Sequence, residues 1–187
     1  MKVFIAGIGC VGKTAVGARL AERLGCQFYD LDREIERHFG KSVGRLRAET
    51  LTPYSYRKQF ASVVLKKVLQ AEPDSSFVMA LLPSGLMDSM WAILKKTDRI
   101  VVALRDSAEN ILSRITFYDT DSRPITKTLT EKERAYYLRD IRADMAYFGR
   151  TYRRADLTAD IAGLDVEGSA TKIERLLGER QSAAGAS

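Results

Sequence analysis

Residues 7–14 of the chain read Gly-Ile-Gly-Cys-Val-Gly-Lys-Thr, which is a complete G-x-x-x-x-G-K-T phosphate-loop motif. The preceding residues 2–6 are apolar and strand-forming, and residues 14–24 carry apolar side chains at helical spacing. A strand, a glycine-rich turn and a helix N-terminus together form an anion site from backbone N–H groups and the helix dipole. The motif therefore predicts a nucleoside triphosphate site and the first strand–turn–helix unit of the fold.

The motif assigns a role to each of its polar residues. Lys13 is expected to reach the β- and γ-phosphates and to be catalytic, and Thr14 to place its hydroxyl on Mg²⁺. Gly7 and Gly12 supply the backbone freedom that a tight turn around phosphate requires. ATP and Mg²⁺ are thus the cofactors that the sequence predicts. The loop residues expected to bind the nucleotide are Gly9, Cys10, Val11, Gly12, Lys13, Thr14 and Ala15.

The chain has 187 residues, enough for one domain with a proper core. We expect residues 1–178 to form that domain and the small, polar residues 179–187 to be disordered. No apolar run is long enough to span a bilayer, and the N-terminus lacks the features of a signal peptide, so a cytoplasmic location is expected. Cys10 and Cys26 provide neither a disulfide framework nor, with histidines, a zinc site.

The formal charge of +6 does not by itself indicate nucleic acid. Basic residues alternate with acidic ones along the predicted helices, as in residues 32–37, which is typical of a solvated helix face. The aromatic and basic interleaving of a single-strand binder is missing. We therefore expect a small anionic substrate as the partner, no nucleic acid, no membrane, and a monomer.

Strand-like and helix-like segments alternate along the chain, which favours a parallel sheet covered by helices. A polar segment at 116–130, rich in Asp and Thr, is interpreted as a mobile lid. The expected strands are 2–6, 27–29, 76–82, 99–104 and 156–159. The expected helices are 14–24, 32–39, 53–71, 86–95, 107–115, 131–152 and 169–177, with a short further segment at 42–49.

Two aspartates follow the second predicted strand, at the edge where parallel sheets bind ligands. Asp30 is expected to order the Mg²⁺ shell, directly or through water. Asp32 is expected to accept the proton of an acceptor hydroxyl and so to be catalytic. Asp32 is equally a good candidate for the N-cap of the following helix, so both roles stay open.

Arginines form the second part of the predicted site. Arg123 in the lid is expected to neutralise the transferring phosphoryl group. Arg114, at the base of the lid, is placed to stack on the adenine ring, and Arg57 to bind an acceptor carboxylate bidentately. Any single arginine in such a chain is more often a surface residue, so the prediction depends on their joint placement.

Residues 3–32 resemble the start of the shikimate kinase family. The shared features are the phosphate loop, the V-G-x-x-L-A-x-x-L-G helix and the F-x-D-x-D ending, and residues 33–36 continue the likeness. Tyr56-Arg57 resembles the Phe-Arg pair whose arginine holds the shikimate carboxylate in that family. Arg123-Pro124 resembles its lid motif, and Arg142 falls at the spacing of the second carboxylate-binding arginine.

The chain departs from the family's pattern in the acceptor-binding part. Leu82-Pro83-Ser84, followed by Gly85, stands where the family has three glycines whose N–H groups face substrate, and Pro83 has no N–H to donate. Phe60 replaces a glutamate, and the R-x-P-L-Y pattern near Arg142 is loosened. The ATP-handling residues are thus better preserved than the acceptor-handling ones.

The resemblance implies a three-layer α/β P-loop kinase of the nucleoside-monophosphate-kinase type, with a five-stranded parallel sheet and a lid near 116–130. It implies transfer of the γ-phosphoryl group of ATP to shikimate, giving shikimate 3-phosphate in aromatic amino acid biosynthesis. The residues expected to bind the substrate are Asp32, Arg57, Ser84, Gly85 and Arg142. Two alternatives stay open: a kinase for another small acid, such as a gluconate-like sugar acid, or a nucleotide-binding module without turnover.

Overall fold

The computed structural model describes residues 1–118 and 124–185. Its main sheet is five-stranded and parallel throughout, with the strand order β2-β3-β1-β4-β7. This confirms the predicted α/β class, and each strand lies within a few residues of its expected position. The strands are β1 (Lys2–Ala6), β2 (Gln27–Asp30), β3 (Phe77–Ala80), β4 (Ile100–Arg105) and β7 (Leu157–Asp160).

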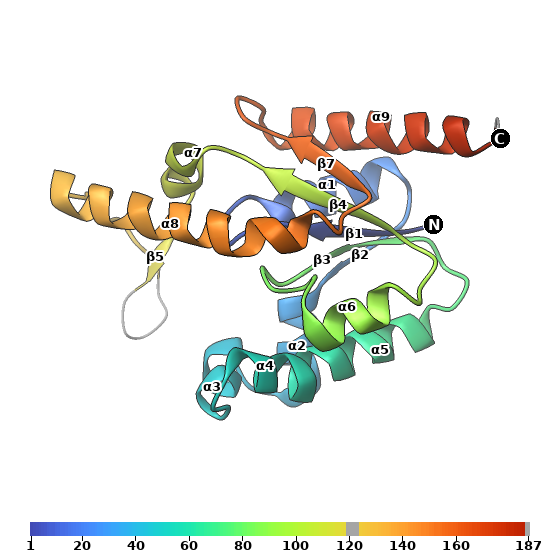
Figure 1. Cartoon of the computed structure of the whole chain (residues 1–187), viewed down its shortest axis with the longest axis horizontal. Coiled ribbons are helices and arrows are strands. Elements are labelled where there is room, and N and C mark those ends of the chain that lie inside the picture. Colours follow the sequence, from blue (N-terminus) through green and yellow to red (C-terminus); the bar gives the residue numbers. More distant parts are fainter. Residues whose placement is uncertain (119–123, 186–187) are drawn as a thin grey trace.

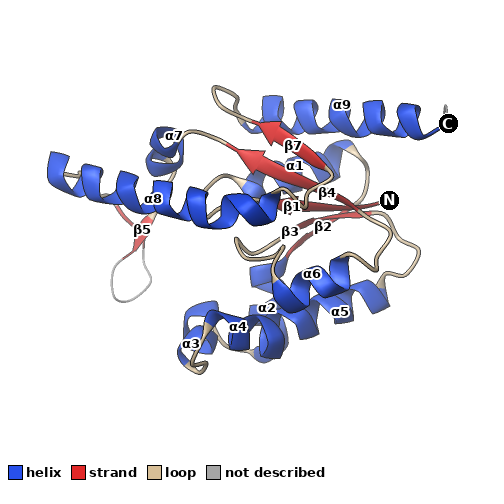
Figure 2. Cartoon of the chain, viewed as in Figure 1, coloured by secondary structure: helices blue, strands red, loops and turns tan. Residues whose placement is uncertain are grey.

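Helices surround this sheet, as Figure 2 shows. Helices α1 and α9 pack against each other on one side, and α5 and α6 lie on the other side (Figure 1). The helices are α1 (Lys13–Arg23), α2 (Leu31–Phe39), α3 (Val43–Ala48), α4 (Pro53–Tyr56), the π-helix η1 (Arg57–Ala61), α5 (Ser62–Ala71), α6 (Asp88–Leu94), α7 (Ala108–Ser113), α8 (Glu131–Tyr152) and α9 (Val166–Gly185).

The core is centred on β1 and β4. Residues 3–6 of β1 are fully buried, and residues 101–104 of β4 are at most 2% exposed. A strand with both faces covered reads as a continuous apolar run, which is why β1, β3 and β4 were recognisable in the sequence. In Figure 1 the arrowhead of β4 points toward α7, which follows β4 beyond the carboxyl edge of the sheet.

Four local features differ from expectation. The N-cap of α2 is Asp30, whose side chain accepts the N–H groups of Asp32 and Arg33, so Asp32 lies in the first turn and is not the cap. The predicted helix 53–71 contains a π-turn. The lid segment contains a short antiparallel pair, β5 (Phe117–Tyr118) with β6 (Pro124–Ile125).

The fourth difference concerns the end of the chain. Helix α9 continues to Gly185, so residues 179–185 are helical and the predicted disordered tail is wrong over that range. Residues 186–187 lie outside the described residues. Within the described ranges, none of the helices combines the length and the apolar character that crossing a membrane requires.

Candidate active site

The phosphate loop joins β1 to α1 and has the strained backbone that its glycines predict. Gly7 and Gly12 have φ values of +149° and +106°, and Cys10 has +59°. A Cβ at Gly7 would lie 2.8 Å from Val11 Cγ1, so the loop closes tightly on itself there. No side chain caps the N-terminus of α1, so its first N–H groups are left for a ligand. This is the geometry of an anion cradle.

Lys13 lies across this loop. Its Nζ donates a hydrogen bond to the carbonyl oxygen of Ile8 at 2.7 Å. Burial lowers the pKa of Lys13 to about 8, although the nearby Asp32, Cys10 and Asp30 oppose this shift. A partly buried ammonium that forms no ion pair among the described residues can bind an incoming phosphate, which would stabilise its protonated form.

Thr14 and Asp30 place two oxygen donors beside the loop. The Thr14 hydroxyl donates to Asp30 Oδ2 at 2.6 Å, while Asp30 Oδ1 caps α2. Mg²⁺ prefers such hard oxygen ligands and usually completes its shell with waters and substrate phosphates. Within residues 1–118 and 124–185, no cluster of three or more His, Cys, Asp or Glu forms a metal cage. The donor pair therefore fits a magnesium ion that is bound together with a nucleotide.

Asp32 lies two residues after Asp30, in the first turn of α2. Burial raises its pKa, with the positive charges of Arg47 and Lys13 opposing the rise and Asp30 and Glu36 adding to it. Its Oδ1 atom is buried and forms no hydrogen bond. Buried carboxylate oxygens are normally paired, so this one has an acceptor site to spare for a ligand hydroxyl.

A cavity of about 500 Å³ opens on one side of the phosphate loop. We call it the β4 pocket, because residues 104–107 at the end of β4 form its floor. The other lining residues are Ile8 and Val11 of the loop, Ile111 of α7, Met145, Gly149 and Tyr152 of α8, Asp160 at the end of β7, and Ala162 after it.

Arg114 lies beside the β4 pocket. Its Nη2 forms a 2.5 Å ion pair with Asp106, and its Nη1 donates to the carbonyl oxygen of Val11 at 3.4 Å. Burial alone would raise the pKa of Asp106, but hydrogen bonds from Asn110, the Ser107 amide and Arg114 hold it below the ordinary value. Arg114 is thus fixed against the phosphate loop and does not line the pocket itself.

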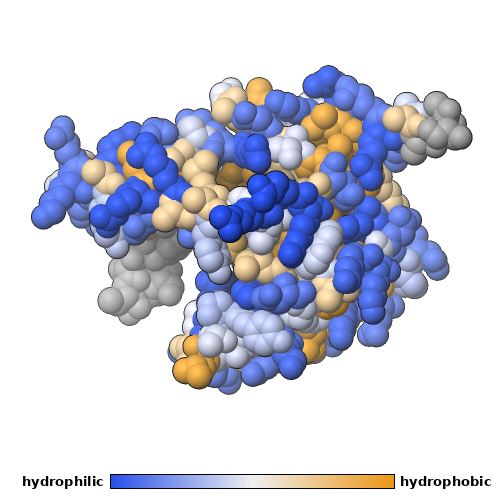
Figure 3. Space-filling view, viewed as in Figure 1, coloured by the Kyte–Doolittle hydropathy of each residue, from blue (hydrophilic) through white to orange (hydrophobic). Residues whose placement is uncertain are grey.

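A second cavity, of about 400 Å³, opens on the other side of the loop. We call it the α3–α8 pocket, and in Figure 3 the molecular face is recessed between α8 and the α3–α4 segment. Its polar and charged lining residues come from segments far apart in the chain. The lining residues are Gly9, Arg47, Thr50, Leu51, Thr52, Pro53, Tyr56, Arg57, Pro83, Ser84, Asp144 and Phe148.

Arg57 reaches this pocket from the π-turn η1, with only 6% of its surface exposed. Its Nε and Nη2 both donate to Asp88 Oδ2, the former at 3.1 Å. Asp88 has a φ of +46°, a conformation that non-glycine residues adopt only where surrounding contacts hold it. Arg57, the predicted carboxylate-binding arginine, therefore lines the pocket, and its guanidinium already pairs with the Asp88 carboxylate of this chain.

The turn after β3 shows how the departure at residues 82–85 is accommodated. Leu82 is buried in the core, while Pro83 and Ser84 line the α3–α8 pocket. The Tyr152 hydroxyl donates to the Pro83 carbonyl oxygen at 2.9 Å, and the Gly85 amide donates to Leu82. Proline thus removes a donor from the pocket wall, and its carbonyl is tied to the end of α8.

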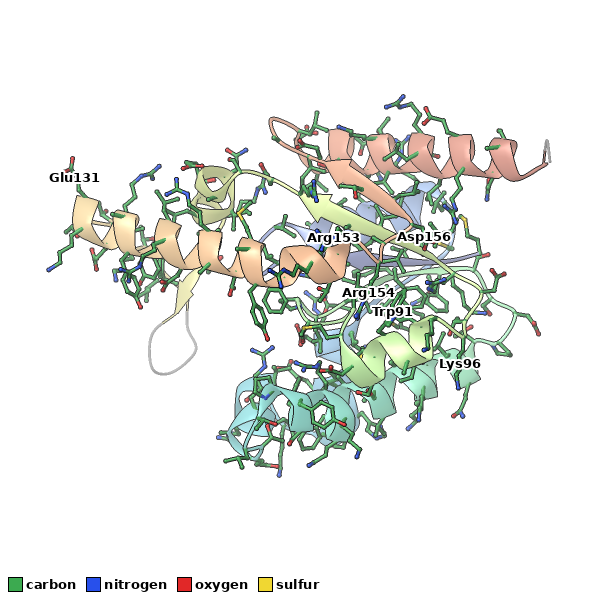
Figure 4. The ribbon with its side chains drawn as sticks, viewed as in Figure 1. Trp91, Lys96, Glu131, Arg153, Arg154 and Asp156 are labelled. Carbon is green, nitrogen blue, oxygen red and sulfur yellow. The ribbon has the colours of Figure 1, made fainter. Side chains whose placement is uncertain are left out.

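A second tie joins the same two regions. Arg154, just after α8, donates to the Leu86 carbonyl oxygen at 2.5 Å, and its guanidinium lies 5.6 Å from the Trp91 ring centroid. Figure 4 shows Arg154 beside Trp91 of α6. Contacts from the end of α8 therefore hold the turn after β3 in one position, whereas three glycines would leave its backbone more flexible.

Three of the predicted substrate-binding residues, Asp32, Gly85 and Arg142, do not line this pocket. Arg142 of α8 pairs with Glu109 of α7 at 2.7 Å and does not meet Arg57. Gly85 is buried in its turn and does not line the pocket, since a Cβ there would lie 2.7 Å from Leu81 Cβ. Arg123 lies outside the described residues.

Most of the lining residues were not predicted as site residues, among them Arg47, Asp144 and Phe148. Arg47 belongs to α3, which the sequence marks only as a short segment, and Asp144 and Phe148 are spaced four residues apart on α8. That spacing puts them on one helix face, but nothing in the local sequence says which face meets the phosphate loop.

A model of the shikimate kinase family matches residues 9–166. The chain is 30% identical over 179 residues to a shikimate kinase of Geobacter sulfurreducens, and the match covers 96% of this chain and 92% of that protein. It is 31% identical over 120 residues to a shikimate kinase of Salinibacter ruber, covering 64% of this chain and 56% of that protein's length.

Solved structures show the same likeness. The structure described as shikimate kinase from Acinetobacter baumannii in complex with shikimate superposes with a TM-score of 0.75 at 26% identity. The alignment covers 96% of this chain and 93% of that one.

Proposed function

The chain belongs to the shikimate kinase family, and we propose that it transfers the γ-phosphoryl group of ATP to a hydroxyl of shikimate, giving shikimate 3-phosphate. One observation carries this proposal beyond the family assignment. The phosphate loop contributes Ile8 and Val11 to the β4 pocket and Gly9 to the α3–α8 pocket, so it lies between the two. A nucleotide on one side can then face a small acceptor on the other, which is the arrangement that in-line transfer requires.

On the nucleotide side, we assign the phosphates to the loop amides and Lys13. Thr14 and Asp30 would hold Mg²⁺, which when bound neutralises charge on the β- and γ-phosphates. The 2.6 Å contact between their oxygens supports this pairing. Arg114 is held beside the loop by Asp106, which supports a role next to the nucleotide.

On the acceptor side, Asp32 is the proposed base. Its buried, unpaired Oδ1 can accept the proton of the attacking hydroxyl, and its raised pKa brings it closer to the range in which a carboxylate is an effective base. Arg57 and Ser84 line the α3–α8 pocket and would donate hydrogen bonds to the substrate there. Arg123 stays a predicted lid residue that neutralises the transferring group.

We further propose that the chain acts as a monomer in the cytoplasm, where ATP is available.

The test is an ADP-release assay with the purified protein, in which shikimate is compared with a panel of sugar acids and polyols. We expect saturable turnover with shikimate, and a loss of at least about 100-fold in kcat in Asp32→Asn, because a positioned base contributes about 10²–10⁴-fold. Asp98→Asn is the matched control, since Asp98 is exposed between α6 and β4 and lines neither pocket.

The acceptor panel separates the remaining candidates. If the protein turned over a sugar acid and not shikimate, it would still be a kinase, but with a different acceptor. The proline-containing turn after β3 is the feature that would explain this change of acceptor. ATP binding without turnover on any acceptor would contradict the kinase assignment altogether.

A further inference from the structure

The α3–α8 pocket contains two guanidinium groups, and one of them is already neutralised. Arg57 is almost fully buried and uses two of its N–H groups on Asp88. An acceptor carboxylate entering the pocket would therefore find little uncompensated positive charge at Arg57. Charge-assisted hydrogen bonds are strong only where the charges are not already satisfied elsewhere.

The second arginine expected for the carboxylate, Arg142, does not supply that charge either. Its guanidinium binds Glu109 of α7, and it lines neither the α3–α8 pocket nor the β4 pocket. The pocket thus needs another cation if it is to hold an anionic acceptor.

Arg47 is such a cation. It reaches the pocket from the last turn of α3, and among the described residues it forms no ion pair with Asp or Glu. Its neighbour Leu46 is 1% exposed, which anchors the helix to the core while Arg47 stays exposed on the pocket side. The guanidinium is therefore held by its helix and still available to a ligand.

Tyr56 orients this guanidinium. The Arg47 Cζ atom lies 5.4 Å from the Tyr56 ring centroid, within the range of a cation–π contact. Tyr56 is only 4% exposed, and its hydroxyl is buried without a hydrogen-bond partner. This contact keeps the guanidinium beside the pocket, where it can bind a planar carboxylate.

Tyr56 adds a second polar group to this pocket. Its hydroxyl is buried without a hydrogen-bond partner, and Tyr56 lines the pocket together with Arg47. A ligand with a carboxylate for Arg47 and a hydroxyl for Tyr56 would satisfy both groups.

We propose that Arg47 binds the carboxylate of the acceptor, alongside Arg57, and so takes the place that the family resemblance gives to Arg142. This inference rests on the proposed kinase function and adds to it a specificity-determining residue on α3.

The test compares Arg47→Gln with Arg45→Gln in steady-state kinetics. Arg45 is exposed on the same helix and lines neither pocket, and its backbone N–H, which Ser42 caps, is kept in the variant. We expect Arg47→Gln to raise KM for shikimate by about 10–100-fold, the usual worth of a hydrogen bond to a charged group, with KM for ATP unchanged. Arg45→Gln should stay within about twofold of wild type.

The methyl ester of shikimate separates recognition from a structural role. The ester has no charge for Arg47 to bind, so wild type and Arg47→Gln should use it with the same KM. If Arg47 only supports Tyr56, the substitution will raise KM for the acid and the ester by the same factor, which would overturn the proposal. An unchanged KM for shikimate in Arg47→Gln would overturn it as well.

These outcomes are distinct from a failure of the proposed function. If wild type uses another acid in place of shikimate, the shikimate assignment fails and the same comparison is made with that acid and its methyl ester. If wild type turns over none of the acids, both proposals fall.

Discussion

At the scale of single residues, the site is marked by groups whose bonding is incomplete. Lys13 is partly buried with a backbone carbonyl as its hydrogen-bond partner, and Asp32 has a buried oxygen without one. Both arrangements cost free energy in the free protein, and both are relieved by a ligand of the right charge. Unsatisfied groups of this kind are more informative about function than the paired residues around them.

The lowered pKa of Lys13 leads to a measurable proton uptake. Because the pKa is about 8, roughly half of the free protein is deprotonated at Lys13 at pH 8. The triphosphate favours the ammonium form and raises this pKa, so binding draws a proton from the buffer. We expect an uptake of about half a proton per nucleotide at pH 8, falling toward zero at pH 6.5, in calorimetry with buffers of different ionisation enthalpy.

Lys13→Arg is the control for this measurement, because arginine stays protonated throughout that pH range. The variant should bind nucleotide without net uptake at pH 8. Equal uptake by wild type and Lys13→Arg would show that another group titrates.

At the scale of elements, the turn after β3 replaces flexibility with fixed contacts. Pro83 and Leu86 offer their carbonyl oxygens to Tyr152 and Arg154 near the end of α8. This links the wall of the α3–α8 pocket to the helix that also supplies Asp144 and Phe148. The position of α8 therefore sets the width of the pocket.

Gly85 in this turn is needed for packing. A Cβ at Gly85 would lie 2.7 Å from Leu81 Cβ and 3.0 Å from the Leu82 carbonyl oxygen, and neither atom can swing away as the tip of a long side chain could. We expect Gly85→Ala to lower the free energy of unfolding by about 1–3 kcal/mol in urea titration, the usual cost of overpacking.

Gly178→Ala is the matched control. Gly178 lies in α9, and a methyl group added to its Cα would have nothing within 4 Å, so alanine should stabilise the helix by up to about 1 kcal/mol. If Gly85→Ala left the free energy of unfolding unchanged, the turn would be able to shift, and packing would not be the reason for a glycine at this position.

At the scale of the whole molecule, the C-terminal helix stabilises the phosphate-loop helix. Arg23 of α1 forms ion pairs with Glu167 and Glu174 of α9. These pairs are partly exposed and contribute little on their own. The apolar contacts beneath them matter more, since Ala170, Ile173 and Leu177 are at most 2% exposed.

Ile173→Ala tests this support. We expect it to lower the free energy of unfolding by about 2–5 kcal/mol, because it leaves a cavity between α9 and the rest of the core. Val166→Ala, at an exposed position of the same helix, should change it by less than about 0.5 kcal/mol. Both can be followed by thermal unfolding, and equal melting temperatures for the two variants would show that α9 does not support the core.

Local patterns along the chain were sufficient to predict the fold class, the element order and the roles proposed for Lys13, Thr14 and Asp30. The phosphate loop, the apolar strands and the amphipathic helices are each recognisable within a short stretch of sequence. The alternative role of Asp32 as the cap of α2 lay two residues late, because Asp30 and Asp32 have equal capping propensity and only the path of β2 distinguishes them.

Which residues line the α3–α8 pocket, in contrast, is decided only by the tertiary structure. Arg47, Ser84 and Asp144 come from a short helix, a turn and a long helix, and no local signal relates them. The same holds for the pairing of Arg57 with Asp88 and of Arg142 with Glu109. Side-chain pairing between distant segments follows from how the elements pack, and a periodicity along the chain holds no information about that packing.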